Sequence, residues 1–180
     1  CGPKEDRVPF MTQERVWELL IEAQALGVKE FYFTGGEPML HPDFFAIIER
    51  TLQQGPVHVL TNGILIDAAA AQRFAALGAG SRYSLELRVS LDGMTAEQND
   101  PVRGRGTFAR ITAGLRELAR AAISPVITIV EHQDGMGDAA ARQEFLAFAR
   151  ELGCDVAGIV DIVQIIAGAT DHIIGTGAAI

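Results

Sequence analysis

Four short segments of the chain combine glycine with hydroxyl, amide, acidic or histidine side chains. They are Gly35-Gly36-Glu37-Pro38, Thr61-Asn62-Gly63, Ser90-Leu91-Asp92-Gly93 and Glu131-His132. Each segment follows a short apolar run that is typical of a buried strand. The carboxyl ends of parallel strands share one edge of a sheet, and ligands of β/α proteins bind there. The sequence therefore predicts one ligand-binding rim built from all four segments.

The first segment is suited to holding an ammonium group. Gly35 and Gly36 carry no side chain, so a ligand can lie against backbone N–H and C=O groups. Pro38 has no N–H and stiffens the exit from the strand, and Glu37 adds a carboxylate to the turn. The same residues also suit a tight strand-to-helix turn with an exposed glutamate. The segment alone leaves both interpretations open.

Cysteines and histidines give weaker signals. The two cysteines, Cys1 and Cys154, form neither a disulfide framework nor a CxxC pair, which favours a reducing, cytoplasmic setting. We interpret Cys154, which follows Gly153, as a buried apolar residue. We expect His41 to shape the start of a helix, and His58 to lie within a strand.

The elements that position these residues alternate between strand and helix. Strands are predicted to begin near residues 31, 57, 85, 126 and 156, with helical patterns between them. Thr12, Asp43 and Asp67 can cap three of the helices. A polar loop is expected to hold Asn99, Asp100, Pro101 and residues 103–106. This spacing is typical of parallel strands joined by helical crossovers. An open or closed β/α barrel and a doubly wound sheet both give this local pattern, so periodicity does not separate them.

Composition narrows the class of protein. The 180 residues, 48% of them hydrophobic, suffice for one domain with a core. A net charge of −8 argues against nucleic acid or a membrane surface as a partner. Neither a transmembrane run nor a signal peptide is recognisable. We expect one domain over residues 1–161 and a poorly patterned strand or tail over 162–180. The cysteine at position 1 suggests a piece of a longer protein.

The segment that runs from Phe33 to Pro42 resembles the GGEP motif of the radical S-adenosylmethionine (SAM) superfamily. Segments 59–63, 89–93 and 100–108 are similar to the same family in the same order, so the resemblance covers roughly residues 10 to 155. It implies a partial radical SAM β/α barrel with parallel strands that lacks its first βα unit. Such a piece should expose an edge strand, which is a hazard for association.

The resemblance implies binding roles for the GGEP residues. In this family the GGEP turn binds the methionine amino group of SAM. Gly35, Gly36 and Glu37 would take that role here, largely through backbone atoms, with Pro38 completing the turn.

It also implies roles for residues further along the chain. Ser90 and Arg103 would hold the SAM carboxylate, because arginine offers paired N–H donors, and Arg105 is the second choice. Asn62 and Asp92 would lie near the ribose or the substrate. Asn62 and Asp92 also each precede a glycine, as turn residues do, and this second interpretation stays open.

The implied activity is reductive cleavage of SAM by a [4Fe-4S] cluster. The products are methionine and a 5′-deoxyadenosyl radical, which abstracts hydrogen from a substrate. Members that act on peptides or make peptide-derived cofactors are the most similar in appearance, so a peptide or a small molecule is the expected substrate. A flavodoxin or ferredoxin would donate the electron. The sequence assigns no catalytic residue.

The sequence departs from the family in its cysteines. The cluster needs thiolate ligands, usually spaced Cys-x3-Cys-x2-Cys, and that motif is missing. Cys1 is either the last cluster ligand or a residue just after the motif. The following Gly2-Pro3-Lys4 favours the second interpretation. With at most one cluster ligand, this segment alone is expected to be inactive.

Two other functions remain as alternatives. The chain would be a non-catalytic β/α ligand- or partner-binding domain if no Cys-x3-Cys-x2-Cys precedes Cys1 in the full gene. A β/α-barrel lyase or aldolase would use Glu131 or His132 and would expect a lysine at a strand end. Lys4 and Lys29, the only lysines, do not lie at one.

Overall fold

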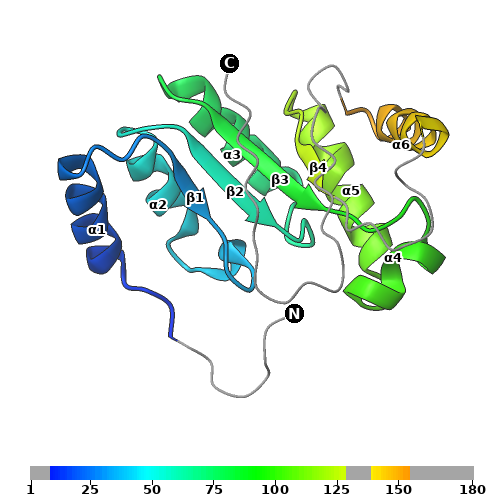
Figure 1. Ribbon diagram of the computed structural model, residues 1–180, viewed down its shortest axis with the longest axis horizontal. Helices are drawn as coiled ribbons and strands as arrows, with labels where there is room; N and C mark the ends of the chain where they lie inside the picture. The colour runs from blue at the N-terminus through cyan, green and yellow to red at the C-terminus, as the bar shows by residue number, and fades with distance from the viewer. Residues whose placement is uncertain (1–8, 129–138, 155–180) are drawn as a thin grey trace.

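The computed structural model describes residues 9–128 and 139–154 as a succession of strands and helices (Figure 1). In chain order the elements are α1 (Gln13–Ala25), β1 (Phe31–Phe33), the short 3-10 helix η1 (Pro38–Leu40), α2 (Phe44–Thr51), β2 (Val57–Thr61), α3 (Ala68–Gly80), β3 (Leu85–Ser90), α4 (Ala96–Arg103), α5 (Thr107–Arg120), β4 (Val126–Thr128) and α6 (Ala139–Glu151). The strand that we expect near residue 156 lies outside these ranges.

The four strands form one parallel sheet in the order β1-β2-β3-β4. A doubly wound sheet reverses its strand order at a switch point, whereas this sheet adds each new strand on the same side. The order is therefore that of part of a β/α barrel, as the resemblance implies. Within the part of the chain that the structure describes, β1 pairs only with β2, so its other edge is unpaired.

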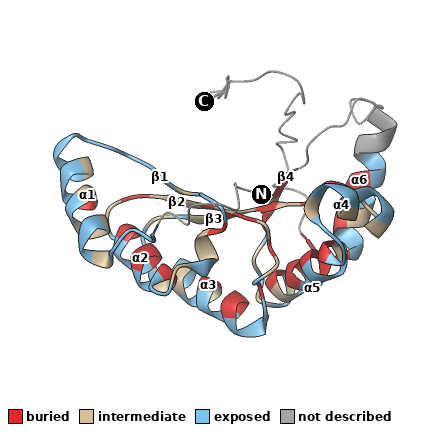
Figure 2. Cartoon of the chain, turned by 90° about the horizontal axis from the view of Figure 1, so that it is seen from below, coloured by how far each residue is buried: buried red, intermediate tan, exposed pale blue. Residues whose placement is uncertain are grey.

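Helices α1, α2, α3 and α5 lie on one face of the sheet, and the core lies between the two layers (Figure 2). Side chains alternate along a strand, so every second residue of β2 is buried toward the helices. Val59 and Val89 of the sheet and Leu115 of α5 are fully buried there. A parallel strand is stable only when its apolar face is covered in this way.

The other face of the sheet is polar near the strand starts. The rings of Tyr32 and His58 stack, with their centroids 4.3 Å apart. His58 Nδ1 lies 3.0 Å from Glu86 Oε1, and Arg88 Nε lies 2.6 Å from the same oxygen. Partial burial raises the pKa of Glu86, but hydrogen bonds and charge from His58 and Arg88 together outweigh it, so the pKa lies below its ordinary value. His58 thus lies in a strand, as predicted.

Two expectations about helix starts are wrong. We expected Asp43 to cap the helix that follows it, but its side chain makes no capping hydrogen bond at α2. Instead, His41 Nδ1 accepts the Asp43 backbone N–H (3.0 Å) and Nε2 lies 2.8 Å from Met11 O, which fixes the start of α2. The polar stretch expected to be a loop contains α4, with Pro101 inside it.

None of the helices within residues 9–128 and 139–154 is both long enough and apolar enough to cross a lipid bilayer.

Candidate functional site

The turn after β1 presents bare backbone to open space. Gly35 and Gly36 are exposed, and Gly35 has φ +145°, a conformation that residues with a side chain rarely adopt. A Cβ built on either glycine meets no atom within 4 Å. A ligand could therefore approach the peptide groups of this turn directly.

Glu37 holds that turn against the end of β2. Its carboxylate is buried and accepts three hydrogen bonds, from Met39 N (3.1 Å), Thr61 Oγ1 (2.8 Å) and Asn62 N (2.7 Å). Pro38 starts η1, where its missing N–H costs nothing. The side chain of Glu37 thus fixes the position of the turn, which leaves the backbone to face a ligand.

Asn62 forms a local turn at the end of β2. Its Oδ1 accepts the Ile64 backbone N–H at 2.9 Å, a short-range bond common for asparagine. Gly63 follows with φ +74°, and a Cβ there would meet Val89 at 2.7 Å. The turn interpretation of Asn62 is thus realised, and a contact with ribose or substrate stays a prediction.

Ser90 ends β3 beside β4. Its Oγ lies 3.2 Å from Thr128 Oγ1, and the two residues are register partners. Our sequence interpretation missed Thr128, because its position beside Ser90 depends on how β4 pairs with β3. The pair places two hydroxyl groups side by side at the carboxyl edge of the sheet.

Asp92 and Arg103 form an ion pair next to this edge. Asp92 Oδ2 and Arg103 Nε are 2.7 Å apart, and the two side chains are 0% and 22% exposed. Both atoms are buried, and the Nε–H is not aligned as a hydrogen bond to the oxygen, so the contact is ionic. The structure thus brings the two predicted residues together, whereas Arg105 is exposed in the loop before α5.

A buried asparagine joins the end of β3 to α4 and α5. Asn99 is 0% exposed; its Oδ1 accepts the Asp92 backbone N–H (3.1 Å) and its Nδ2 donates to Thr107 Oγ1 (3.0 Å). The neighbouring Asp100 accepts the Phe108 backbone N–H at the start of α5, and this bond lowers the Asp100 pKa below its ordinary value. We had interpreted Asn99 as a loop residue; its burial is a tertiary property.

The first three predicted segments lie on one edge of the sheet. Because β1, β2 and β3 are parallel neighbours, the residues that follow them emerge on the same side, toward which the strand arrows point in Figure 1. Glu37 joins the first segment to the second directly. The fourth segment, Glu131-His132, lies outside the described residues.

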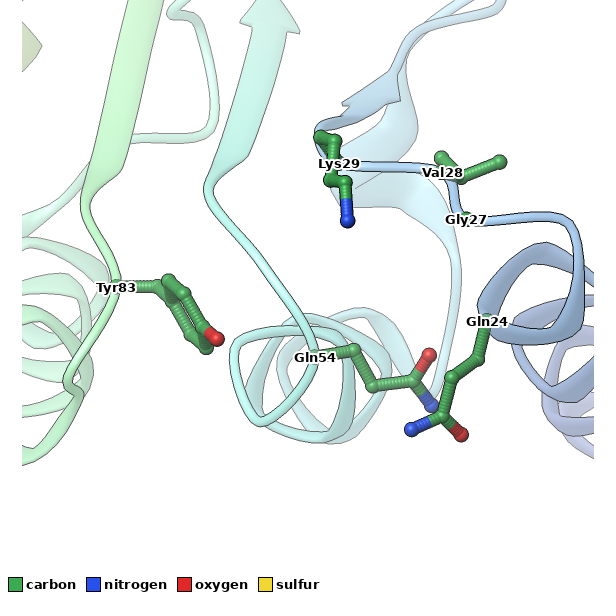
Figure 3. Close-up of a pocket in the computed structure, with 6 residues that line it drawn as sticks. All are labelled: Gln24, Gly27, Val28, Lys29, Gln54 and Tyr83. Carbon is green, nitrogen blue, oxygen red and sulfur yellow. The ribbon is translucent and has the colours of Figure 1, made fainter.

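A hollow at the opposite edge contains none of the predicted site residues. It encloses about 190 Å³ and is lined by Gln24, Gly27, Val28, Lys29, Gln54 and Tyr83. Figure 3 shows the Lys29 ammonium, the Tyr83 hydroxyl and the two glutamine amides around it. Lys29 and Tyr83 precede β1 and β3, so this hollow lies beside the strand starts.

The residues of the carboxyl edge fit SAM better than they fit an iron–sulfur cluster. The open glycine turn, the hydroxyl pair and the arginine match the amino and carboxylate groups of an amino acid. Within residues 9–128 and 139–154 there is no group of three or more His, Cys, Asp or Glu side chains that could hold a metal. Cys154 is buried, and burial raises its pKa. Cys1 lies outside the described residues.

Comparisons by sequence relate the chain to known proteins. The sequence profile of the Radical SAM superfamily matches residues 1–136. Mycofactocin maturase MftC of Mycobacterium ulcerans is 32% identical over 140 residues, which are 76% of this chain and 35% of that protein. An AdoMet-dependent heme synthase of Methanosarcina barkeri is 33% identical over 124 residues, 67% of this chain and 34% of that protein.

Solved structures show the same fold. Streptococcus suis SuiB bound to its precursor peptide SuiA aligns over 86% of this chain and 33% of its own, with a TM-score of 0.65 and 20% identity. The structure of anSMEcpe with bound AdoMet and a peptide aligns over 71% of this chain and 37% of its own, with a TM-score of 0.57 and 20% identity.

The chain spans about a third of the length of these relatives. The profile match covers most of its sequence, including the glycine turn and the ends of β2 and β3. The chain belongs to the radical SAM superfamily.

Proposed function

We propose that this chain is the SAM-holding portion of a radical SAM enzyme that acts on a peptide or a peptide-derived substrate. One observation carries the proposal: the exposed, side-chain-free turn at Gly35 and Gly36 shares a sheet edge with Ser90 and Arg103. These groups suit the two ends of an amino acid, the ammonium and the carboxylate.

The turn would bind the ammonium of SAM. An ammonium group has three N–H donors and needs acceptors, which exposed backbone carbonyls supply. Such carbonyls must be held still, since a shift of about 1 Å can cost a hundredfold in rate. The three hydrogen bonds of the Glu37 carboxylate would provide that fixity by fastening the turn to Thr61 and Asn62.

Ser90 and Arg103 would bind the carboxylate of SAM. A hydroxyl donates one hydrogen bond, and a guanidinium can donate two parallel bonds to the same carboxylate. Ser90 is half-buried at the end of β3, and Arg103 is the last residue of α4. Asn62 remains a candidate for the ribose side of the site. Asp92 was expected there too, but its side chain is 0% exposed and pairs with Arg103.

A [4Fe-4S] cluster, when bound, would supply the electron that cleaves SAM to the 5′-deoxyadenosyl radical. The cluster thiolates would come from outside the described residues, with Cys1 as one candidate ligand. A flavodoxin or ferredoxin would deliver the electron. The part of the chain that the structure describes would orient SAM and keep water from its reactive end.

Two findings support a peptide as the substrate class. The SuiB structure holds a precursor peptide, and the anSMEcpe structure holds both AdoMet and a peptide. The similarity to a heme synthase shows that relatives of this chain differ in what they act on.

Anaerobic reconstitution of the full-length gene product with iron and sulfide tests the proposal. We expect absorbance in the iron–sulfur bands and release of 5′-deoxyadenosine that requires both SAM and a reductant. A full-length protein that binds no cluster and releases no 5′-deoxyadenosine would instead be a ligand- or partner-binding domain, and the proposal would be wrong.

A further inference from the structure

We infer that Asp92 is a positioning residue: it orients the guanidinium of Arg103 so that the terminal nitrogens of Arg103 meet the carboxylate of the ligand beside Ser90. The inference deepens the proposed function and rests on it. It replaces the expectation that Asp92 faces the ribose or the substrate with a role that acts through another side chain.

The geometry of the ion pair carries the first step. Asp92 Oδ2 lies 2.7 Å from Nε of Arg103, and both atoms are buried. The Asp92 side chain is 0% exposed, so a ligand cannot reach its carboxylate without a rearrangement of the site. Arg103 retains 22% exposure. Since Nε already faces Asp92, the two terminal nitrogens of the guanidinium are the groups left for a ligand.

The surroundings of Asp92 carry the second step. Asn99 is fully buried, and its Oδ1 accepts the Asp92 backbone N–H at 3.1 Å. Its Nδ2 donates to Thr107 Oγ1 at 3.0 Å and to Asp100 Oδ1 at 3.2 Å. The backbone of Asp92 and the helix that carries Arg103 are therefore tied to the start of α5. Because the Asp92 carboxylate is buried and its backbone is held by Asn99, it constrains the orientation of the Arg103 guanidinium.

The chemistry of arginine carries the third step. A guanidinium is a planar fork of five N–H donors, so it can contact one carboxylate through Nε and a second through its terminal nitrogens. A lysine ammonium is a single point charge without a fork. Arg103 between Asp92 and a ligand carboxylate would thus be a bridge for which lysine is a poor substitute.

The test measures binding of two ligands to the full-length, reconstituted protein by equilibrium dialysis. One ligand is SAM, and the other is decarboxylated SAM, which keeps the ribose, the adenine and the amino group. We expect Arg103→Gln and Arg103→Lys each to weaken SAM binding about tenfold or more, the value of a lost charge-assisted hydrogen bond. Binding of decarboxylated SAM should change less than about threefold.

Asp92 is then tested through Asp92→Ala and Asp92→Asn. Alanine and asparagine both remove the negative charge beside Nε, so each should weaken SAM binding by about tenfold. In a double-mutant cycle, Asp92→Ala should add little to Arg103→Gln, because both changes remove the same contact. Thermal unfolding of each variant shows whether it folds.

Distinct results overturn the inference. Equal losses for both ligands in Asp92→Asn would mean that Asp92 contacts the ribose directly. Full SAM affinity in Arg103→Lys, or additive effects of the Asp92 and Arg103 substitutions, would show that Arg103 does not link Asp92 to the ligand carboxylate. The measurement on Arg103→Lys tests the inference even if Asp92→Ala does not fold. If the unmodified protein does not bind SAM at all, the proposed function itself is wrong.

Discussion

The glycine turn, residues 35–37, and the junction of β3, α4 and α5, which contains Asp92, Asn99 and Arg103, present binding groups to a ligand in opposite ways. The turn at Gly35 and Gly36 is bare, exposed and surrounded by open space. The junction is dense, with Asn99 at 0% exposure and the Asp92–Arg103 pair beside it. A site can offer a ligand backbone groups by removing side chains, or a side chain by fixing it with others. Substitutions in the two regions should therefore have different effects on ligand binding and on stability.

The largest expected effect comes from adding a side chain to the turn. Gly36→Val should reduce SAM affinity about a hundredfold, because the branched side chain would fill the space where the ligand must lie. The midpoint of thermal unfolding should stay near that of the unmodified protein, since a Cβ at this position meets no atom within 4 Å. Equilibrium dialysis and thermal melts measure the two quantities.

Gly114→Ala is the matched control for that change. Its Cβ would lie 2.9 Å from Gly63 O, so the variant should lose stability without a new group near the turn. Comparable losses of affinity in both variants, or a collapse of stability in Gly36→Val, would contradict the view that the turn is open for a ligand.

A smaller effect is expected at the junction, where the quantity that changes is the stability of the protein. Asn99→Ala leaves the Asp92 backbone N–H without its partner and should reduce the free energy of unfolding by about 1–3 kcal/mol. Chemical denaturation measures the loss. Arg110→Ala, at an exposed position of α5, should change it by less than about 0.5 kcal/mol. If the two variants are equally stable, Asn99 does not hold the junction together as we describe.

The smallest effect concerns pH at the same junction. Hydrogen bonds from the backbone N–H of Phe108 and Gly106 lower the pKa of Asp100 in the folded state. A lowered folded pKa contributes stability above the unfolded pKa, and this contribution is lost as the pH falls through the folded value. The unmodified protein should therefore lose more thermal stability than Asp100→Asn as the pH is lowered below the ordinary aspartate range. Parallel curves for the two proteins would refute this.

The sequence predicted the parts of the fold that depend on local pattern. Thr12 and Asp67 cap their helices with the side-chain bonds that residues at helix starts commonly make. The starts of the strands β1, β2, β3 and β4 are also where the apolar runs indicate them. These features depend on residues close together in the chain, which is why periodicity and capping rules find them.

The parts that were missed depend on contacts between distant segments. Asp92 and Arg103 were each assigned to a ligand, because nothing in their spacing shows that a helix, α4, brings one to the other. The sequence alone indicates a loop residue at Asn99, and only the fold shows that Asn99 is buried. Thr128 matters only through its register with Ser90. Pairing across the sheet edge is a tertiary property, which local rules cannot give.

The central claim is that the turn at residues 35–37 holds the amino-acid end of SAM. The most direct test is a crystal structure of the full-length protein with SAM bound. The claim predicts the SAM amino nitrogen within hydrogen-bonding distance, about 3.2 Å or less, of backbone oxygens of that turn, with the carboxylate toward Ser90 and Arg103. A methionine moiety held anywhere else on the protein would contradict it.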